Sequence, residues 1–439
     1  MTYEETLDYL FTSIPMFQRS GATAYKPGLD TSIALDRLLD HPHKAYKTIH
    51  VGGTNGKGST SHLIAAILQQ AGYKVGLFTS PHLIDFRERI RVNGIPVSKE
   101  FVVSFIEKNR PLFEPLHPSF FELTSTMALA YFQHMKVDYA VIEVGLGGRL
   151  DSTNIITPIL SIITNISKDH VQFLGDTLEA IATEKAGIIK SGIPVVIGDV
   201  DSPEVMHVFR EKAAHTDSPV YASTEARPIH SGELGKDGRW HYQTCHYGAL
   251  TGELGGIIQE HNAATVLTAI DVLNRHYGLH LPEHAVREGF AHVVELTGLK
   301  GRWQKLHEAP TVVCDTGHNT GGWKYLSKQL GLELKRHKTL RMIIGMVNDK
   351  DINGVLAMMP KDARYYFTQA SIPRALPAED FAKQASGHGL KGEIYANVAQ
   401  AVKQAMEEAS PDDFIFIGGS TFIVADALEH IDIINLKTN

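Results

Sequence analysis

The chain reads Val51-Gly52-Gly53-Thr54-Asn55-Gly56-Lys57-Gly58-Ser59-Thr60 between a short β-branched run and an apolar segment with helical spacing. The preceding run, 48–51, predicts a buried strand, and apolar residues on one face of 63–68 predict a helix. A glycine-rich turn between a strand and a helix is typical of a phosphate-binding loop, because its backbone N–H groups point at phosphate oxygens. Lys57 would place a cation on the outer phosphates, and Ser59 or Thr60 would place a hydroxyl near a metal ion.

The match to the usual P-loop pattern is imperfect. That pattern has a glycine where this chain has Val51, and a serine or threonine where it has Gly58. A plain glycine-rich turn between strand and helix is the alternative interpretation. We favour phosphate binding, because a plain turn has no need of a lysine between two glycines.

The composition is that of an ordinary globular protein, with 43% hydrophobic and 21% charged residues in 439. A net charge of −7 and the lack of any Lys/Arg run argue against a nucleic-acid partner. The two cysteines, Cys245 and Cys314, are far apart, which indicates a reducing compartment rather than a disulfide framework. The acidic N-terminus and the lack of a long apolar run predict no signal peptide and no membrane span. We therefore expect a cytoplasmic protein.

The chain alternates predicted strands and helices, which favours an α/β fold with parallel, doubly wound sheets. A linker near 297–301 separates two such series, so we expect two domains, 1–297 and 298–439. Residues 217–258 differ, and we interpret their short alternating runs as a few antiparallel strands or a small subdomain. The strands expected in the parallel sheets are 48–51, 74–78, 138–145, 160–166 and 194–198, followed after the linker by 311–315, 340–346, 364–368, 392–395 and 414–417.

Polar residues stand at the ends of two of these strands, and in open α/β sheets ligands bind at the carboxyl ends of strands. Ser80 follows the second strand, where its hydroxyl could ligate a metal or could merely belong to a turn. Glu143 lies in an otherwise apolar strand, where a carboxylate is costly unless it is paired or metal-bound. Its position is typical of the Mg²⁺-side acid of phosphoryl-transfer sites, and a solvated strand-end acid is the alternative.

Four motifs follow one another along the chain: 53–59, Ser80-Pro81-His82-Leu83, Glu143-Val144-Gly145-Leu146-Gly147-Gly148-Arg149-Leu150-Asp151-Ser152-Thr153-Asn154, and Asp315-x-x-His318-Asn319. In their order and identity they resemble those of the folylpolyglutamate synthase and dihydrofolate synthase family. This family lies within the wider group of ATP-dependent amide ligases that includes the muramyl peptide ligases. The resemblance spans nearly the whole chain, and the long third motif separates the folate branch from the muramyl branch. One departure is Thr316-Gly317 and Thr320, where the family often has Gly-Ala and Pro.

The resemblance implies a P-loop ATPase-like N-terminal domain that binds ATP and a pterin, and a smaller Rossmann-like C-terminal glutamate-ligase domain. It implies that Lys185 is carried as a carbamate, which would turn a cation into an anionic oxygen ligand. The string Asp349-Lys350-Asp351 also matches a recurring one. The implied ATP-binding residues are Thr54, Asn55, Gly56, Lys57, Gly58, Ser59, Asn262, Arg302 and Asp315; the metal ligands are Ser80, Glu143 and His170; and the pterin-side residues are Phe121, Glu122, Leu150, Asp151 and Ser152.

The reaction implied by the resemblance is the ATP-dependent ligation of L-glutamate to dihydropteroate, to folate polyglutamates, or to both. An acyl phosphate would form first, with release of ADP and phosphate, and one or two Mg²⁺ ions would assist. His318 is our candidate base for the attacking amine, although it could instead orient substrate. The alternatives are a muramyl-peptide-type ligase and a P-loop ATPase that makes no amide bond. We expect a monomer whose partners are the pterin or folate, L-glutamate and ATP.

Overall fold

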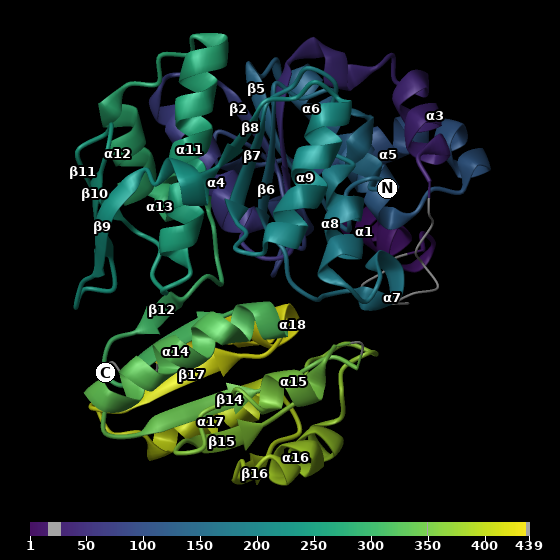
Figure 1. Ribbon diagram of the computed structural model, residues 1–439. Helices are drawn as coiled ribbons and strands as arrows, with labels where there is room; N and C mark the ends of the chain where they lie inside the picture. Colours follow the sequence, from purple (N-terminus) through teal and green to yellow (C-terminus); the bar gives the residue numbers. More distant parts are fainter. Residues whose placement is uncertain (16–27, 349, 436–439) are drawn as a thin grey trace. The chain divides into compact units, whose positions relative to one another are not determined.

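The computed structural model describes residues 1–15, 28–348 and 350–435, and it divides the chain into two compact units (Figure 1). The first unit comprises Met1–Glu253 and Gln259–Leu299, and the second comprises Leu254–Ile258 and Lys300–Asn439. The short segment 254–258 thus belongs to the second unit, although the residues on either side of it belong to the first. Asp349, part of the string noted above, lies outside the described residues.

The first unit is built on a sheet of eight strands in the order β4-β3-β2-β5-β1-β6-β7-β8. In this sheet β2, β5, β1, β6, β7 and β8 run parallel to one another. The strands β3 and β4 form an antiparallel hairpin at one edge, and β3 is antiparallel to β2. The glycine-rich loop follows β1, which lies between β5 and β6, so the loop emerges from the interior of the sheet. The strands are β1 (Lys47–Gly52), β2 (Val75–Phe78), β3 (Ile90–Val92), β4 (Ile95–Pro96), β5 (Tyr139–Glu143), β6 (Leu160–Asn165), β7 (Val195–Asp199) and β8 (Val220–Ala222).

Helices and short 3-10 turns connect these strands. The first turn after β1 opens α4, whose residues from Gly58 to Leu68 are all buried, so this helix lies inside the unit. The helices are α1 (Tyr3–Thr12), α3 (Asp30–Leu38), α4 (Lys57–Gln70), α5 (Lys99–Phe113), α6 (Phe120–Met135), α7 (Val171–Leu174), α8 (Leu178–Ala186), α9 (Pro203–His215), α10 (Ser223–Ala226), α11 (Gln259–Tyr277), α12 (Glu283–Ala291) and α13 (Val293–Thr297); the 3-10 turns are η2 (Pro42–Ala45), η3 (Phe86–Arg89), η4 (Glu114–Leu116) and η5 (Ser152–Ile155).

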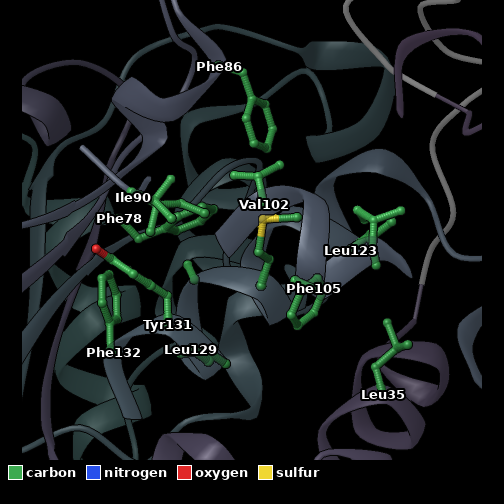
Figure 2. Packing of buried hydrophobic residues seen from close by; sticks show 14 of the residues in the cluster. Leu35, Phe78, Phe86, Ile90, Val102, Phe105, Leu123, Leu129, Tyr131 and Phe132 are labelled. Atoms are coloured by element: carbon green, nitrogen blue, oxygen red, sulfur yellow. The ribbon is translucent and has the colours of Figure 1, made fainter. Parts of the chain in front are cut away.

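A large aromatic cluster joins α5 and α6 to the sheet (Figure 2). Phe78 and Ile90 come from the strands, and Phe105 and Phe132 come from the two helices. The helix α6 lies so close to β2 that a Cβ atom on Gly76 would be 2.7 Å from the ring of Phe132. The absence of a side chain at this position therefore sets the distance between helix and sheet.

Residues 217–258 contain the predicted antiparallel strands, which form a separate sheet in the order β11-β10-β9. The strands are β9 (Ile229–Leu234), β10 (Trp240–Thr244) and β11 (Ala249–Gly252). Trp240 and Tyr242 are buried on one face and stack with 5.4 Å between ring centroids. This alternation of buried and exposed residues is the pattern by which the sequence predicted them.

The second unit has a sheet in the order β12-β13-β17-β14-β15-β16, in which only β12 is antiparallel. The sequence analysis did not predict β12, a short edge strand with one buried residue. Trp323, Met342 and Phe416 are in its buried core. The strands are β12 (Gln304–His307), β13 (Thr311–Asp315), β14 (Leu340–Ile344), β15 (Arg364–Phe367), β16 (Gly392–Ile394) and β17 (Phe414–Gly418); the helices are α14 (Thr320–Arg336), α15 (Ile352–Leu356), α16 (Ala378–Gly387), α17 (Val398–Glu408), α18 (Thr421–Glu429) and α19 (Ile431–Asn435).

Both units therefore have the predicted α/β architecture, with the predicted linker close to the boundary at Leu299 and Lys300. In the part of the chain that the structure describes, no helix combines the length and the apolar character needed to cross a membrane.

The packing of α12 on α4 gives a stability prediction. A Cβ atom on Gly289 would lie 2.9 Å from the backbone N and Cα of Ile67, so we expect Gly289→Ala to lower the free energy of unfolding by about 1–3 kcal/mol. In Gly331→Ala on α14 the added Cβ meets no described atom within 4 Å apart from the backbone of its own helix. The free energy of unfolding of this variant should therefore rise by about 0.5–1 kcal/mol, because alanine lowers the entropy of the unfolded chain. Urea denaturation measures both, and equal midpoints for the two variants would contradict the prediction.

Candidate active site

The loop after β1 has the backbone of a phosphate-binding turn. Gly53 and Gly56 have φ of +133° and +82°, which side chains rarely allow. There is also no room for a side chain, because a Cβ would lie 1.9 Å from Thr164 Oγ1 at Gly53 and 2.3 Å from Asn262 Oδ1 at Gly56. Among the described residues no side chain caps the start of α4, so its first N–H groups suit an anion.

The end of β6 holds the loop in this conformation. Asn55 N donates to Asn165 Oδ1 over 2.9 Å, and Thr54 Oγ1 both donates to Ser167 O and accepts from Ser167 N, each over 3.1 Å. Thr164 Oγ1 donates to Asn55 O over 2.5 Å. The predicted loop residues are therefore fixed by the protein itself, so the backbone donors are already arranged before a ligand arrives.

Two lysines meet at this loop. Lys57 Nζ donates to Gly53 O over 3.2 Å and to Thr54 O over 3.0 Å, and Lys185 Nζ on α8 donates to the same Gly53 O over 2.9 Å. Lys185 is buried, and burial together with the charge of Lys57 lowers its pKa from 10.5 to about 7. The structure thus brings the two predicted lysines together around one carbonyl oxygen.

The structure brings two of the predicted metal ligands, Ser80 and Glu143, together at the ends of the neighbouring strands β2 and β5. Glu143 is the last residue of β5 and lies beside Val51 in the sheet; it is buried, and its Oε2 accepts from Ser80 N over 3.0 Å. His170 precedes α7 with a φ of +49°, and its N–H donates to Asp169 Oδ1 over 2.9 Å. Within the described chain, no three His, Cys, Asp or Glu residues lie close enough to hold a metal by themselves. A single buried carboxylate with a nearby hydroxyl fits Mg²⁺, which keeps several waters and takes phosphate oxygens as ligands.

The start of α11 also contacts the loop. Gln259 Nε2 donates to Ser59 Oγ over 3.3 Å, and Asn262 Nδ2 donates to Gln259 Oε1 over 2.9 Å. Asn262 is one of the predicted ATP-binding residues, and the structure places it against Gly56. Gln259 is not among the predicted site residues, although the spacing Gln259-x-x-Asn262 puts both side chains on one helix face.

The predicted pterin-side residues are of two kinds. The ring of Phe121 packs on Gly145, since a Cβ atom on Gly145 would lie 2.4 Å from that ring. Leu150 is half-buried. Glu122 instead caps α6, because its Oε2 accepts from the N–H and hydroxyl of Ser119 over 2.7 and 2.8 Å. The hydroxyl of Ser152 accepts from Ser125 Oγ over 3.4 Å.

Asp151 is buried, and both of its carboxylate oxygens accept backbone N–H groups. Oδ2 accepts from Gly145 and Leu146 over 3.0 and 2.8 Å, and Oδ1 accepts from Thr153 over 3.0 Å. Burial raises the pKa of this carboxyl group, and these hydrogen bonds oppose the rise. The carboxylate therefore fixes the loop 145–151 that follows Glu143.

The second unit gathers polar residues at the carboxyl end of its sheet. Asp315 ends β13, and its oxygens accept from Trp303 N and Gly317 N, each over 2.8 Å. Arg302 donates to Gly301 O over 3.2 Å and to the hydroxyl of Thr316. His318 Nδ1 lies 3.0 Å from Thr316 O, and because a carbonyl can only accept, Nδ1 carries the proton and Nε2 is the basic nitrogen.

A second glycine turn stands at the same end of this sheet. Gly418 ends β17, Gly419 has a φ of +92°, and the hydroxyl of Ser420 caps α18 by accepting from Ile423 N over 3.2 Å. The sequence analysis did not single out this turn, although glycines and a serine between a strand and a helix are a recognisable signal.

Two domain families match the chain in the order of its two units. The Mur ligase middle domain family matches residues 51–230, and the family described as the Mur ligase glutamate ligase domain matches residues 301–421. Together with the phosphate loop, these matches define the class of protein: an ATP-dependent amide ligase.

Relatives identify the branch. A Bacillus subtilis dihydrofolate synthase/folylpolyglutamate synthase is 34% identical over 414 residues, which is 91% of this chain and 94% of the relative. The structure of Escherichia coli FolC in complex with DHPP and ADP has a TM-score of 0.83 at 31% identity and covers 99% of both chains. A bifunctional enzyme of the same name with Mn, AMPPNP and L-glutamate bound has a TM-score of 0.80 at 30% identity, with 98% of each chain covered. This chain belongs to the dihydrofolate synthase/folylpolyglutamate synthase family.

The family membership confirms the resemblance predicted from the four motifs, and the fold class and the ligase activity with it. The two alternatives, a muramyl-peptide-type ligase and an ATPase that makes no amide bond, find no support in relatives that align over nearly the whole chain.

The lysine of the loop gives a direct test. We expect Lys57→Ala to lower glutamate-dependent ADP release at least about 100-fold, because the transferring phosphoryl group loses a preorganised cation. The hydrogen bonds from Lys57 to Gly53 O and Thr54 O are lost, and relief of the repulsion with Lys185 offsets part of that loss, so the free energy of unfolding should fall by no more than about 2 kcal/mol. Lys108→Ala, at an exposed site on α5, is the matched control and should retain full activity. A large loss of stability in Lys57→Ala would mean that the lysine is structural.

Proposed function

We propose that this ligase adds L-glutamate both to dihydropteroate and to the polyglutamate tail of tetrahydrofolate. The supporting observation is the similarity over 91% of the chain to an enzyme named for both activities. We assign ATP and the pterin to the region 1–297 and the incoming glutamate to the glutamate-ligase domain 298–439, as the sequence predicts. We further propose that the enzyme works as a monomer in the cytoplasm.

The chemistry follows from what amide formation needs. An oxygen of the acceptor carboxylate attacks the γ-phosphorus of ATP, the bond to ADP breaks, and an acyl phosphate forms. The nitrogen of glutamate then attacks the acyl carbon, the ammonium proton leaves to a base, and phosphate departs. The protein's contribution to both steps is positioning and charge neutralisation. We assign the phosphates to residues 54–59 with Lys57, and the adenine to Asn262; Arg302 and Asp315 would contribute to ATP binding from the second unit.

We propose Mg²⁺ as the metal, with Glu143 and Ser80 as oxygen ligands and His170 as a further ligand. The buried Glu143 carboxylate supports this, although imidazole is an unusual ligand for so hard an ion. When bound, the ion supplies positive charge to the phosphate oxygens. Among the described residues, the carboxylate cluster is too small to hold a metal without ligands from the nucleotide or water.

We place the incoming glutamate at the carboxyl end of the second sheet. The start of α18 suits a carboxylate because its first N–H groups and the helix dipole favour an anion, and Ser420 stands at this start. His318 would take the amine proton at Nε2, since its Nδ1 is committed to Thr316 O.

We place the pterin against Phe121 and Leu150, which offer apolar surface. Glu122, Asp151 and Ser152 support this wall, since each is hydrogen-bonded to other protein groups. The pterin site is thus shaped by these polar residues rather than built from free carboxylates.

The function is tested by supplying each acceptor in turn. Purified enzyme with Mg-ATP and L-glutamate should release ADP and phosphate with dihydropteroate and also with tetrahydrofolate, and should release little when either glutamate or the acceptor is omitted. Turnover with only one acceptor would reduce the proposal to a single activity. ADP release that does not depend on glutamate with any pterin would reject it.

We also propose that Lys185 is carbamylated. Its neutral amine would add to the carbon of CO₂ and lose a proton, giving a carbamate anion. With the pKa near 7, the neutral amine is abundant above that pH. Bicarbonate should therefore restore activity after acid treatment, and at a fixed CO₂ concentration it should do so better at pH 8 than at pH 6. ¹³C-labelled bicarbonate should give a carbamate NMR signal that Lys185→Met lacks; the same signal in that variant would refute the assignment.

A further inference from the structure

A buried histidine lies behind the loop 145–151. His50 is in β1, just ahead of the phosphate loop, and its side chain is fully excluded from solvent. Its Nε2 lies 2.9 Å from Thr153 Oγ1, and the hydroxyl of Thr153 donates in turn to Asp151 Oδ1. A chain of polar groups thus leads from the strand of the phosphate loop to the carboxylate that fixes the loop 145–151.

The direction of this chain can be worked out from its protons. Burial lowers the pKa of His50 from 6.5 to about 3, with a contribution from the charge of Lys190, so the ring is neutral and carries one proton. Because Thr153 gives its single proton to Asp151, its oxygen must accept from His50, which places the ring proton on Nε2. The other nitrogen, Nδ1, is then a bare acceptor, and it has no partner among the described atoms.

The opposite direction is unfavourable. If Thr153 donated to His50, the ring proton would sit on Nδ1, where a buried N–H without a partner costs about 1–3 kcal/mol. An apolar side chain at His50 would avoid even the cost of the bare nitrogen. The contact from Nε2 to Thr153 is therefore the one polar gain that the described structure gives this imidazole.

The consequence lies at the far end of the chain. Asp151 accepts from Gly145 and Leu146, and Gly145 is the residue on which the Phe121 ring rests. Glu143 directly precedes this turn but is held in β5 beside Val51, so a shift of the Asp151 carboxylate would move the backbone under the Phe121 ring and leave the metal-side acid in place.

We propose that His50 is a positioning residue for the acceptor substrate: by donating from Nε2 to Thr153 it holds that hydroxyl on Asp151, which sets the loop 145–151 against Phe121. The imidazole touches neither ATP nor the acceptor. This inference rests on the proposed placement of the pterin at Phe121.

The proposal predicts a selective effect on one substrate. His50→Leu and Thr153→Val should each raise KM for dihydropteroate about three- to tenfold, the factor that corresponds to one net hydrogen bond. KM for ATP should stay within about twofold, because the phosphate loop is braced by β6 instead. His50→Gln keeps an N–H donor at Nε2, and Thr153→Ser keeps a hydroxyl. Both variants should therefore have a KM for dihydropteroate close to that of the wild type. The double variant His50→Leu/Thr153→Val should be no worse than either single change.

The control is Ser161→Ala. Ser161 is the neighbour of His50 in the adjacent strand, is equally buried, and loses a 2.8 Å hydrogen bond to Ile188 O. This variant should lose stability without a change in KM for dihydropteroate. The proposal is overturned if His50→Leu leaves that KM unchanged, if KM rises equally for ATP, or if Ser161→Ala has the same effect. If His50→Leu fails to fold, the isosteric Thr153→Val decides by the same criteria.

A second measurement separates this inference from the proposed function. Wild-type enzyme that is inactive with dihydropteroate would remove that half of the proposed function, but ¹⁵N NMR of labelled histidines still tests His50. Its signals, identified by their absence in His50→Gln, should show a protonated Nε2 and a bare Nδ1, unchanged from about pH 5 to 9. A protonated Nδ1, or a titration within that range, would overturn the relay.

Discussion

Two lysine side chains donate to one carbonyl oxygen in the turn between β1 and α4, and the candidate site of the first unit depends on this close approach. Lys57 and Lys185 both donate to Gly53 O, and the repulsion between them contributes to the lowered pKa of Lys185. Like charges in a buried place are stable only when something anionic joins them or when one is neutralised. A triphosphate would do the first and the carbamate that we propose would do the second, so one electrostatic constraint favours both.

The opposite ends of the second sheet do different work. Before β17 and along β14 and β15, the buried Arg341 donates to Asp413 and Glu408 over 3.0 and 3.1 Å and also contacts Tyr366 over 2.5 Å. Removing one partner of such a buried network is costly, so this end stabilises the unit. The carboxyl end instead carries Asp315, whose raised pKa comes from burial, and the turn before Ser420. Ligand sites in open α/β sheets are expected at this second end.

Much of the site could be predicted because its chemistry is written in short local strings. The phosphate loop, Glu143 at its strand end and the antiparallel strands within 217–258 all follow from spacing and periodicity. The helix cap formed by Ser119 and Glu122 could also be predicted, since a serine followed three residues later by glutamate is a capping box. The sequence analysis overlooked this cap and assigned Glu122 to the pterin side. The engagement of Asp151 was not readable, because its backbone partners depend on how the loop folds back. The edge strand β12 was too short, with too little periodic pattern, to predict.

The placement of residues 254–258 has a consequence for any attempt to take the protein apart. The chain passes between the units at Glu253 and Leu254, at Ile258 and Gln259, and at Leu299 and Lys300. A fragment that ends before Lys300 would retain the buried Leu254 and Gly256 but lack Trp303. Trp303 packs on Gly256, since a Cβ atom on Gly256 would lie 3.2 Å from the Cβ of Trp303, so the fragment would lose this contact. Neither unit is therefore one continuous segment of the chain, and exchanging a unit between relatives would require three junctions rather than one.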